Sequence, residues 1–114
     1  DMMNYIKKNK NKISIYNNSK KAVERADVIF SDKVISMNDK VNKIKKLHDF
    51  KKFKIDKKLM CFAKKDCIFL HCLPRGKEVD EEIFSSRQSK VWQQALNRVY
   101  VQKSILLYCF GKLR

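Results

Sequence analysis

Apolar residues fall into short runs separated by polar, lysine-rich segments, a pattern typical of an α/β protein. Three of these runs have the length and composition of strands, at residues 13–16, 27–31 and 67–71. The first alternates apolar and polar residues, whereas the third is almost unbroken and predicts a buried strand. The pattern therefore predicts a parallel sheet with flanking helices. Its first two strands would be joined by a right-handed crossover through a helix at 20–25, capped by residues 17–19.

Helical periodicity predicts the remaining elements. Apolar residues recur at helical spacing over residues 39–50, and shorter helical stretches fall at 1–10, 57–63 and 79–84, the last being a helix or turn. The final helix is predicted over residues 91–110. It would bury one apolar face, formed by Trp92, Ala95, Leu96, Val99, Leu106 and Phe110.

Reactive side chains gather where the third strand ends. His71 and Cys72 come last in the apolar run, and Pro74 and Arg75 follow in a turn. Pro74 fixes this turn because it has no amide N–H for a ladder and favours an extended conformation at Leu73. In open α/β sheets, ligands bind beyond the carboxyl ends of the strands. An imidazole, a thiol and a guanidinium at this point therefore predict a ligand site.

Asp32 occupies the corresponding position after the second strand, where a carboxylate can hold an ammonium group. Without further information, a helix-capping role in a connecting loop explains this aspartate equally well.

Four segments together resemble the ornithine carbamoyltransferase family, in its C-terminal, ornithine-binding half. They are HCLPR at residues 71–75, EVDEEIF at 78–84, the segment 26–37 with ADVIFSD and SM, and the segment 95–103 with ALNR and QK. One short motif would be a weak signal, but four in the family's order and spacing argue against coincidence. Departures from the family pattern fall at Val34, Asn38 and Leu96, where the family usually has Trp, Gly and an acidic residue.

The resemblance implies an α/β fold that is the Rossmann-like half of a two-domain carbamoyltransferase. Residues 1–114 would be a partial ornithine-binding domain without the opening strand. Residues 91–110 would be the helix that packs toward a missing carbamoyl-phosphate domain. We expect such a fragment to be inactive alone, and the full-length protein to be a homotrimer.

The resemblance also implies a reaction, in which the δ-amine of ornithine attacks carbamoyl phosphate to give citrulline and phosphate, without a metal or an organic cofactor. Cys72 would accept the amine proton if nearby cationic groups lower the pKa of its thiol. The implied ornithine-binding residues are Asp32, Ser36, Met37 and Cys72, the implied carbamoyl-phosphate-binding residues are Cys72, Leu73 and Arg98, and the supporting residues are His71, Pro74 and Arg75.

Composition and charge bear on the other classes. The chain has 114 residues, enough for one domain, and a formal charge of +15. Its basic residues are spread along the sequence without interleaved aromatic residues that would stack on bases, so no nucleic-acid partner is expected. No apolar run approaches the ~18 residues of a spanning helix, and no signal peptide is recognisable. We therefore expect no membrane association and a cytoplasmic or organelle-matrix location.

The four cysteines form no CxxC pair, which favours reduced thiols. Cys61, Cys67 and Cys109 fall in apolar runs and are expected to be inert small hydrophobes. A zinc site that combines cysteines with His48 or His71 is disfavoured, because His71 and Cys72 are neighbours on a strand and point to opposite faces.

Several alternatives stay open. Aspartate carbamoyltransferase is disfavoured, because that family has Pro where Cys72 stands, but carbamoyltransferases for putrescine or acetylornithine share much of the loop. A basic nucleic-acid-binding module would bind heparin or DNA tightly, with a steep salt dependence. A remnant interaction domain without catalysis is the third possibility.

Overall fold

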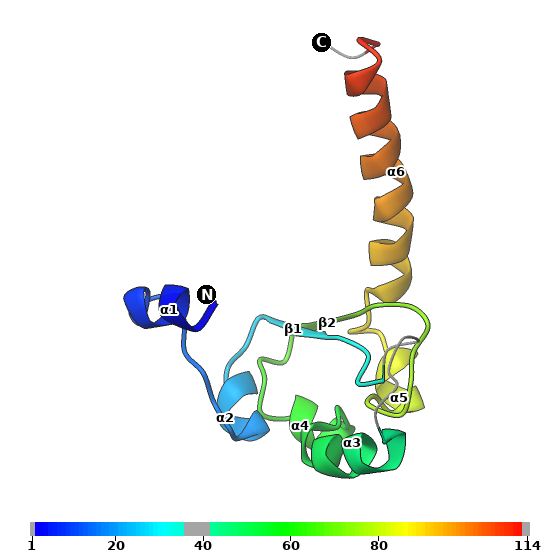
Figure 1. Cartoon of the computed structure of the whole chain (residues 1–114). Helices are drawn as coiled ribbons and strands as arrows, with labels where there is room; N and C mark the ends of the chain where they lie inside the picture. The colour runs from blue at the N-terminus through cyan, green and yellow to red at the C-terminus, as the bar shows by residue number, and fades with distance from the viewer. Residues whose placement is uncertain (1, 36–41, 113–114) are drawn as a thin grey trace.

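Two parallel strands form the centre of the protein. The computed structural model describes residues 2–35 and 42–112. In it, β1 (Val28–Ser31) pairs with β2 (Ile68–His71), in a register that places Val28 opposite Ile68 and Ser31 opposite His71 (Figure 1). Residues 88–90 extend the sheet beyond β2, because the amide of Phe69 donates to Gln88 and the amide of Lys90 donates to Phe69, each at 2.9 Å. The predicted α/β fold with a parallel sheet is confirmed.

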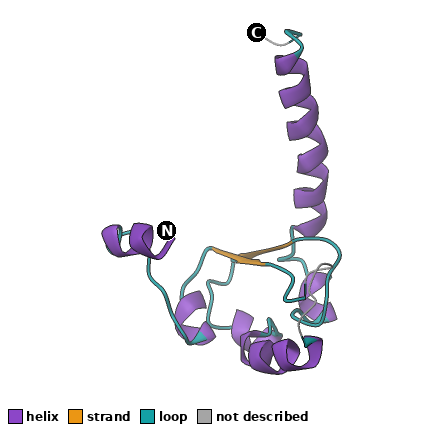
Figure 2. Cartoon of the chain, viewed as in Figure 1, coloured by secondary structure: helices purple, strands orange, loops and turns teal. Residues whose placement is uncertain are grey.

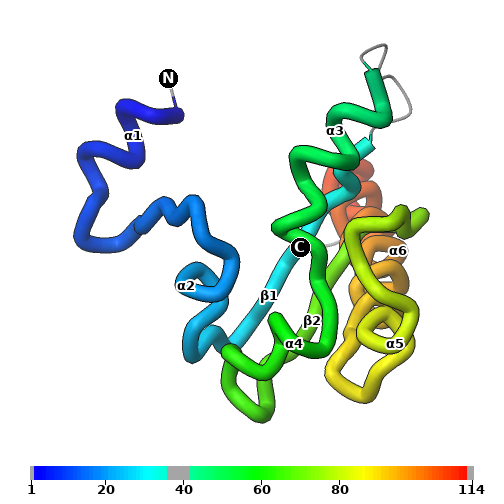
Figure 3. Tube along the Cα trace, turned by 90° about the horizontal axis from the view of Figure 1, so that it is seen from below, coloured from blue at the N-terminus to red at the C-terminus, as the bar shows by residue number. Residues whose placement is uncertain are grey.

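Most of the helices lie on one side of this sheet. The helical elements are α1 (Met2–Lys8), α2 (Ser19–Val23), α3 (Lys43–Phe50), the 3₁₀ turn η1 (Lys51–Phe53), α4 (Lys57–Met60), α5 (Glu81–Phe84) and α6 (Val91–Cys109). Figures 1 and 2 show α2, α3, α4 and α5 beneath the strands, α6 rising on the opposite side, and α1 apart to the left at about the level of the strands. The view from below in Figure 3 shows α3 and α4 in front of the paired strands, with α2 and α5 to either side.

Polar side chains fix where several helices begin. Asn18 accepts hydrogen bonds from the amides of Lys20 and Lys21 at 2.9 and 3.4 Å. This contact satisfies amides that have no partner within the first turn of α2, and it confirms the cap predicted at residues 17–19. Asp56 performs the same role for α4, with its carboxylate 2.7 Å from the amide of Leu59.

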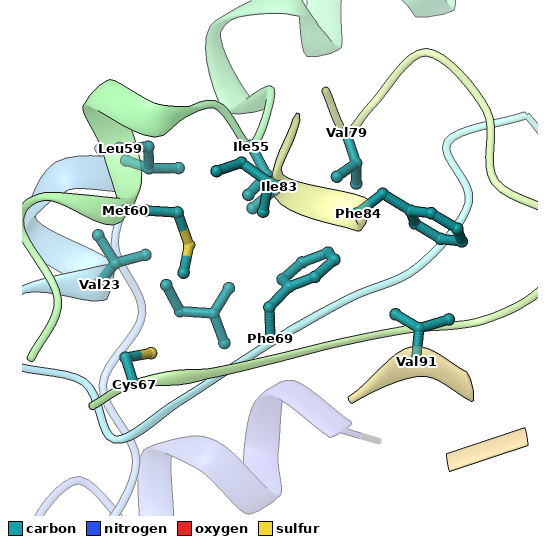
Figure 4. Packing of buried hydrophobic residues seen from close by; sticks show 11 residues of the cluster. Val23, Ile55, Leu59, Met60, Cys67, Phe69, Val79, Ile83, Phe84 and Val91 are labelled. Carbon is teal, nitrogen blue, oxygen red and sulfur yellow. The ribbon is translucent and has the colours of Figure 1, made fainter. Parts of the chain in front are cut away.

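The hydrophobic core fills the space between the sheet and these helices (Figure 4). Alternation along each strand turns Ile29 and Phe69 into this space, and Phe69 is completely buried. Phe30 points the other way and is 60% exposed. The buried residues are Val23, Ile29, Ile55, Leu59, Met60, Cys67, Phe69, Val79, Ile83, Phe84 and Val91.

The strand predicted at residues 13–16 is wrong. This segment has no strand structure, and Ile15 and Tyr16 are exposed. Alternation of apolar and polar residues favours a strand only where a neighbouring strand offers hydrogen bonds, and the described residues provide none for this segment. The predicted parallel pair is therefore also wrong, because β1 pairs with β2 and the connection between them runs through α3, η1 and α4.

The predicted buried face of the last helix is wrong as well. Val91 is the one buried residue of α6. Trp92, Leu96, Val99, Leu106 and Phe110 are all more than half exposed, because α6 extends away from the sheet, and α2, α3, α4 and α5 lie on the sheet's other side (Figure 1). Helical periodicity was correct for the element but does not show what covers it.

Candidate active site

The register of the two strands brings Asp32 and Cys72 together. Ser31 and His71 are paired as the last residues of β1 and β2, so the residues that follow them emerge side by side at the same edge of the sheet. The Cys72 thiol donates a hydrogen bond to Asp32 Oδ1 at 2.9 Å. The same oxygen accepts the amide of Lys33 at 2.7 Å. Two residues 40 positions apart in sequence therefore form one thiol–carboxylate pair.

This pair sets the protonation of both groups. The hydrogen bond from Cys72 and the amide of Lys33 lower the pKa of Asp32, so its carboxylate stays charged. Burial raises the pKa of the Cys72 thiol, and the hydrogen bond to Asp32 raises it further. The condition for Cys72 to accept the amine proton, cationic groups that lower its thiol pKa, is therefore not met in this structure, because burial and the hydrogen bond to Asp32 both raise that pKa.

His71 lies behind Cys72 and is 1% exposed. Its Nδ1 contacts the carbonyl oxygen of Cys72. Its Nε2 lies 3.1 Å from Oε1 of Glu78, within ion-pair distance but without the alignment of a hydrogen bond. The expected supporting role of His71 therefore has a physical basis in the structure. Glu78 was assigned no role from the sequence.

Arg75 contacts the loop and helix that follow β2. Its Nη1 donates to the carbonyl oxygen of Val79 at 2.8 Å, and Nη2 pairs with Glu81. Its guanidinium lies 5.2 Å from the centre of the Phe84 ring, a cation–π contact. The Leu73–Pro74 peptide bond in this loop is cis.

Arg98 reaches the strand ends from α6. It borders a groove of about 380 Å³ whose lining residues are His71, Cys72, Leu73, Gln94, Ala95 and Arg98. The three residues implied for carbamoyl phosphate thus lie around one groove. Gln94 was missed from the sequence, although it precedes Arg98 by four residues, the spacing that places two side chains on one helix face.

The remaining predicted site residues, Ser36 and Met37, lie outside the described residues. Within residues 2–35 and 42–112, no three His, Cys, Asp or Glu side chains come together as potential metal ligands. The four cysteines are unpaired, but Cys61 and Cys109 are exposed, so the prediction that they lie in apolar surroundings is wrong. None of the described helices combines the length and apolar character needed to cross a bilayer.

The sequence profile of one family matches almost the whole chain. This family is described as aspartate/ornithine carbamoyltransferase, Asp/Orn binding domain, and the match covers residues 1–109. The chain belongs to this family.

Relatives of the chain agree with this assignment. The ornithine carbamoyltransferase of a Nitratiruptor species is 43% identical over 110 residues, which are 95% of this chain and 36% of that protein. Two crystal structures are similar in fold. The anabolic ornithine carbamoyltransferase of Campylobacter jejuni has a TM-score of 0.77 and 39% identity, over 89% of this chain and 34% of that one. The Pyrococcus furiosus enzyme has a TM-score of 0.75 and 38% identity, over 85% and 32%. The chain thus spans about a third of the length of these carbamoyltransferases.

Proposed function

We propose that the complete protein carrying this chain transfers the carbamoyl group of carbamoyl phosphate to the δ-amine of ornithine, giving citrulline and phosphate. The observation that carries the proposal is the Asp32–Cys72 pair at the strand ends, next to the groove that Arg98 lines. The carboxylate of Asp32 suits the ammonium group of an amine substrate, and the guanidinium of Arg98 suits a phosphorylated substrate.

Asp32 is the proposed anchor of the amino acid. The lowered pKa keeps its carboxylate charged at neutral pH, and this charge attracts the α-ammonium group of ornithine. Among the described residues, both hydrogen bonds to this carboxylate reach Oδ1. Oδ2 is then the oxygen that would meet the ammonium group. Ser36 and Met37 are proposed to contact the rest of the amino-acid head.

Arg98 and the Leu73 backbone are proposed to hold carbamoyl phosphate. A guanidinium stabilises the negative charge that develops as the phosphate departs, and it does so most effectively where water is excluded. Arg98 is exposed in this chain. The proposal therefore requires that other parts of the complete protein close the groove when substrates bind.

Cys72 takes a different role from the one that the resemblance implied. Its raised pKa disfavours a thiolate, so we propose that the thiol orients the Asp32 carboxylate by donating to it. The attacking amine must still lose a proton. The leaving phosphate gains negative charge as its bond to the carbamoyl carbon breaks, so the reaction itself supplies a proton acceptor.

Citrulline formation by the complete protein tests the proposal. Carbamoyl phosphate would be mixed with ornithine, putrescine, acetylornithine or aspartate in turn, and both phosphate and the carbamoylated product would be measured. We expect the highest kcat/KM with ornithine and no carbamoyl-aspartate, because Asp32 would repel a second carboxylate. A preference for aspartate, or no product with any amine, would refute the proposed function.

A further inference from the structure

We propose that Glu78 is a positioning residue of this site, which fixes the Cys72 backbone through the imidazole of His71. The inference rests on the proposed function, since the Cys72–Leu73 backbone is the part of the site that would meet carbamoyl phosphate. Glu78 follows Gly76 in the loop between β2 and α5 and does not itself line the groove of Arg98.

Burial is the first observation. The side chain of Glu78 is 7% exposed, and that of His71 is fully buried. A carboxylate in such surroundings loses much of its hydration, which is costly unless protein groups replace it. The groups that do so are the amide of Gly76, which donates to Oε1 at 2.6 Å, and the imidazole of His71, whose Nε2 lies 3.1 Å from the same oxygen.

The imidazole connects Glu78 with the reactive strand end. One ring nitrogen of His71 faces the Glu78 carboxylate and the other contacts the carbonyl oxygen of Cys72. Contacts at both nitrogens, one of them at ion-pair distance, restrict how the buried ring can turn or shift. The carbonyl group of Cys72 is therefore contacted by His71, while its thiol donates a hydrogen bond to Asp32.

Lysine side chains are the competing partners of this carboxylate. Glu78 also borders a hollow of about 220 Å³ to which Lys51, Lys54 and Lys77 contribute. The ammonium group of Lys54 pairs with Asp80 instead. Within the described part of the chain, the Glu78 carboxylate is held by Gly76 and His71.

The carboxylate of Glu78 lies so close to Gly76 that there is no room for a side chain at position 76. A Cβ atom at Gly76 would lie 2.5 Å from Oε2 and 3.0 Å from Oε1 of Glu78, closer than unbonded atoms can approach. The backbone of Glu78 is anchored separately, because its carbonyl oxygen accepts the amide of Ile55 at 2.8 Å. An alanine at position 76 would thus push the carboxylate away from His71 while the charge and the backbone anchor remain.

Two variants of the complete protein test the inference. Glu78→Gln keeps the shape of the side chain and removes its charge, and Gly76→Ala keeps the charge and displaces it. The matched control is Glu82→Gln, which removes an exposed carboxylate paired with Lys57. For each variant, kcat and both KM values would be measured, together with the rate at which iodoacetamide modifies Cys72 without substrates, and the melting temperature.

We expect kcat to fall by about tenfold or more in both test variants, because small displacements of reacting groups are costly, while both KM values change far less. In Glu78→Gln, Cys72 should also be modified faster than in the control, since the negative charge of Glu78 is one of the causes that raise the pKa of its thiol. A purely structural role would lower the melting temperature without this division between kcat and KM.

Two other results would overturn the inference. Rates and Cys72 modification equal to those of the control would overturn the inference. Unfolding of both test variants would also overturn it, by assigning Glu78 to folding. If the wild-type protein does not carbamoylate ornithine, the proposed function fails, whereas the modification rate of Cys72 in Gly76→Ala, which keeps the charge of Glu78, still decides whether the placement of Glu78 affects the Cys72 segment.

Discussion

The hydrogen bond from Cys72 to Asp32 determines how both side chains behave. A thiol that donates to a carboxylate keeps its proton, and a carboxylate that accepts two hydrogen bonds keeps its charge. The two residues therefore act as one anionic unit at the strand ends. This unit attracts an ammonium group, which is the property that an amine-binding site requires.

The pH dependence of Cys72 alkylation tests this unit. Only the thiolate is alkylated, and burial and Asp32 raise the thiol pKa, so modification should be slow at about pH 8 and accelerate only as the pH rises above the ordinary range of a cysteine. Asp32→Asn removes one cause of the raised pKa and should increase the rate at that same pH. The exposed Cys61 in the same sample serves as the reference. If Cys72 reacts as fast as Cys61 and ignores the substitution, the thiol is not held by Asp32.

Some residues of the site could be predicted from the sequence, and others could not. Asp32 and Cys72 could be predicted because parallel strands deliver the residues after their last positions to the same edge. Glu78 could not, because its burial depends on the loop after β2 folding back beside His71, and the local pattern shows only a polar residue near a glycine. The direction of the Cys72 pKa could not be predicted from the sequence, because it depends on the burial of the thiol and on the Asp32 carboxylate that the strand register places beside it.

Among the described elements, α6 carries the most exposed large hydrophobic residues. Its Trp92, Leu96, Val99 and Leu106 are each more than half exposed. Apolar surface of this extent usually marks a contact surface. The helix periodicity was sufficient to predict α6, but an amphipathic pattern cannot reveal whether the partner of the apolar positions lies within the same 114 residues.

We therefore expect the 114-residue chain by itself to bind a hydrophobic dye and to associate in solution. The double substitution Val99→Lys and Leu106→Lys should reduce both properties. The matched control is Gln102→Lys with Ser104→Lys, which adds the same charge at exposed polar positions of α6. Dye fluorescence and light scattering would be measured for the three chains. A monodisperse, dye-silent wild-type chain, or equal effects of the two double substitutions, would show that the face is not a contact surface.

The strands illustrate a second limit of local patterns. The apolar run at 67–71 was found because a buried strand is apolar on both faces, and β2 does lie between β1 and residues 88–90. The alternating residues 13–16 have the same strand propensity, yet pairing is not local. A strand forms where another backbone offers its hydrogen bonds, which no window of a few residues can show.

At the scale of the whole molecule, the chain is extended. Its radius of gyration is 17.1 Å, whereas a compact domain of this length would have about 13 Å. The difference arises because α6 projects from the sheet on the side opposite the packed helices and α1 lies apart from them at the end of an extended segment (Figure 1). The site lies at the border between the packed part and α6, so Arg98 and the loop after β2 approach it from different parts of the molecule.

In the function proposed above, Asp32 anchors the amino-acid substrate at the carboxyl ends of β1 and β2. The most direct test is the steady-state kinetics of Asp32→Asn in the complete protein, with Asp66→Asn as the control for loss of an exposed carboxylate. We predict that the KM for ornithine rises by about tenfold or more, because a hydrogen bond to a charged group is lost, while the KM for carbamoyl phosphate stays near that of the control. Equal increases for the two substrates, or none for ornithine, would contradict the account.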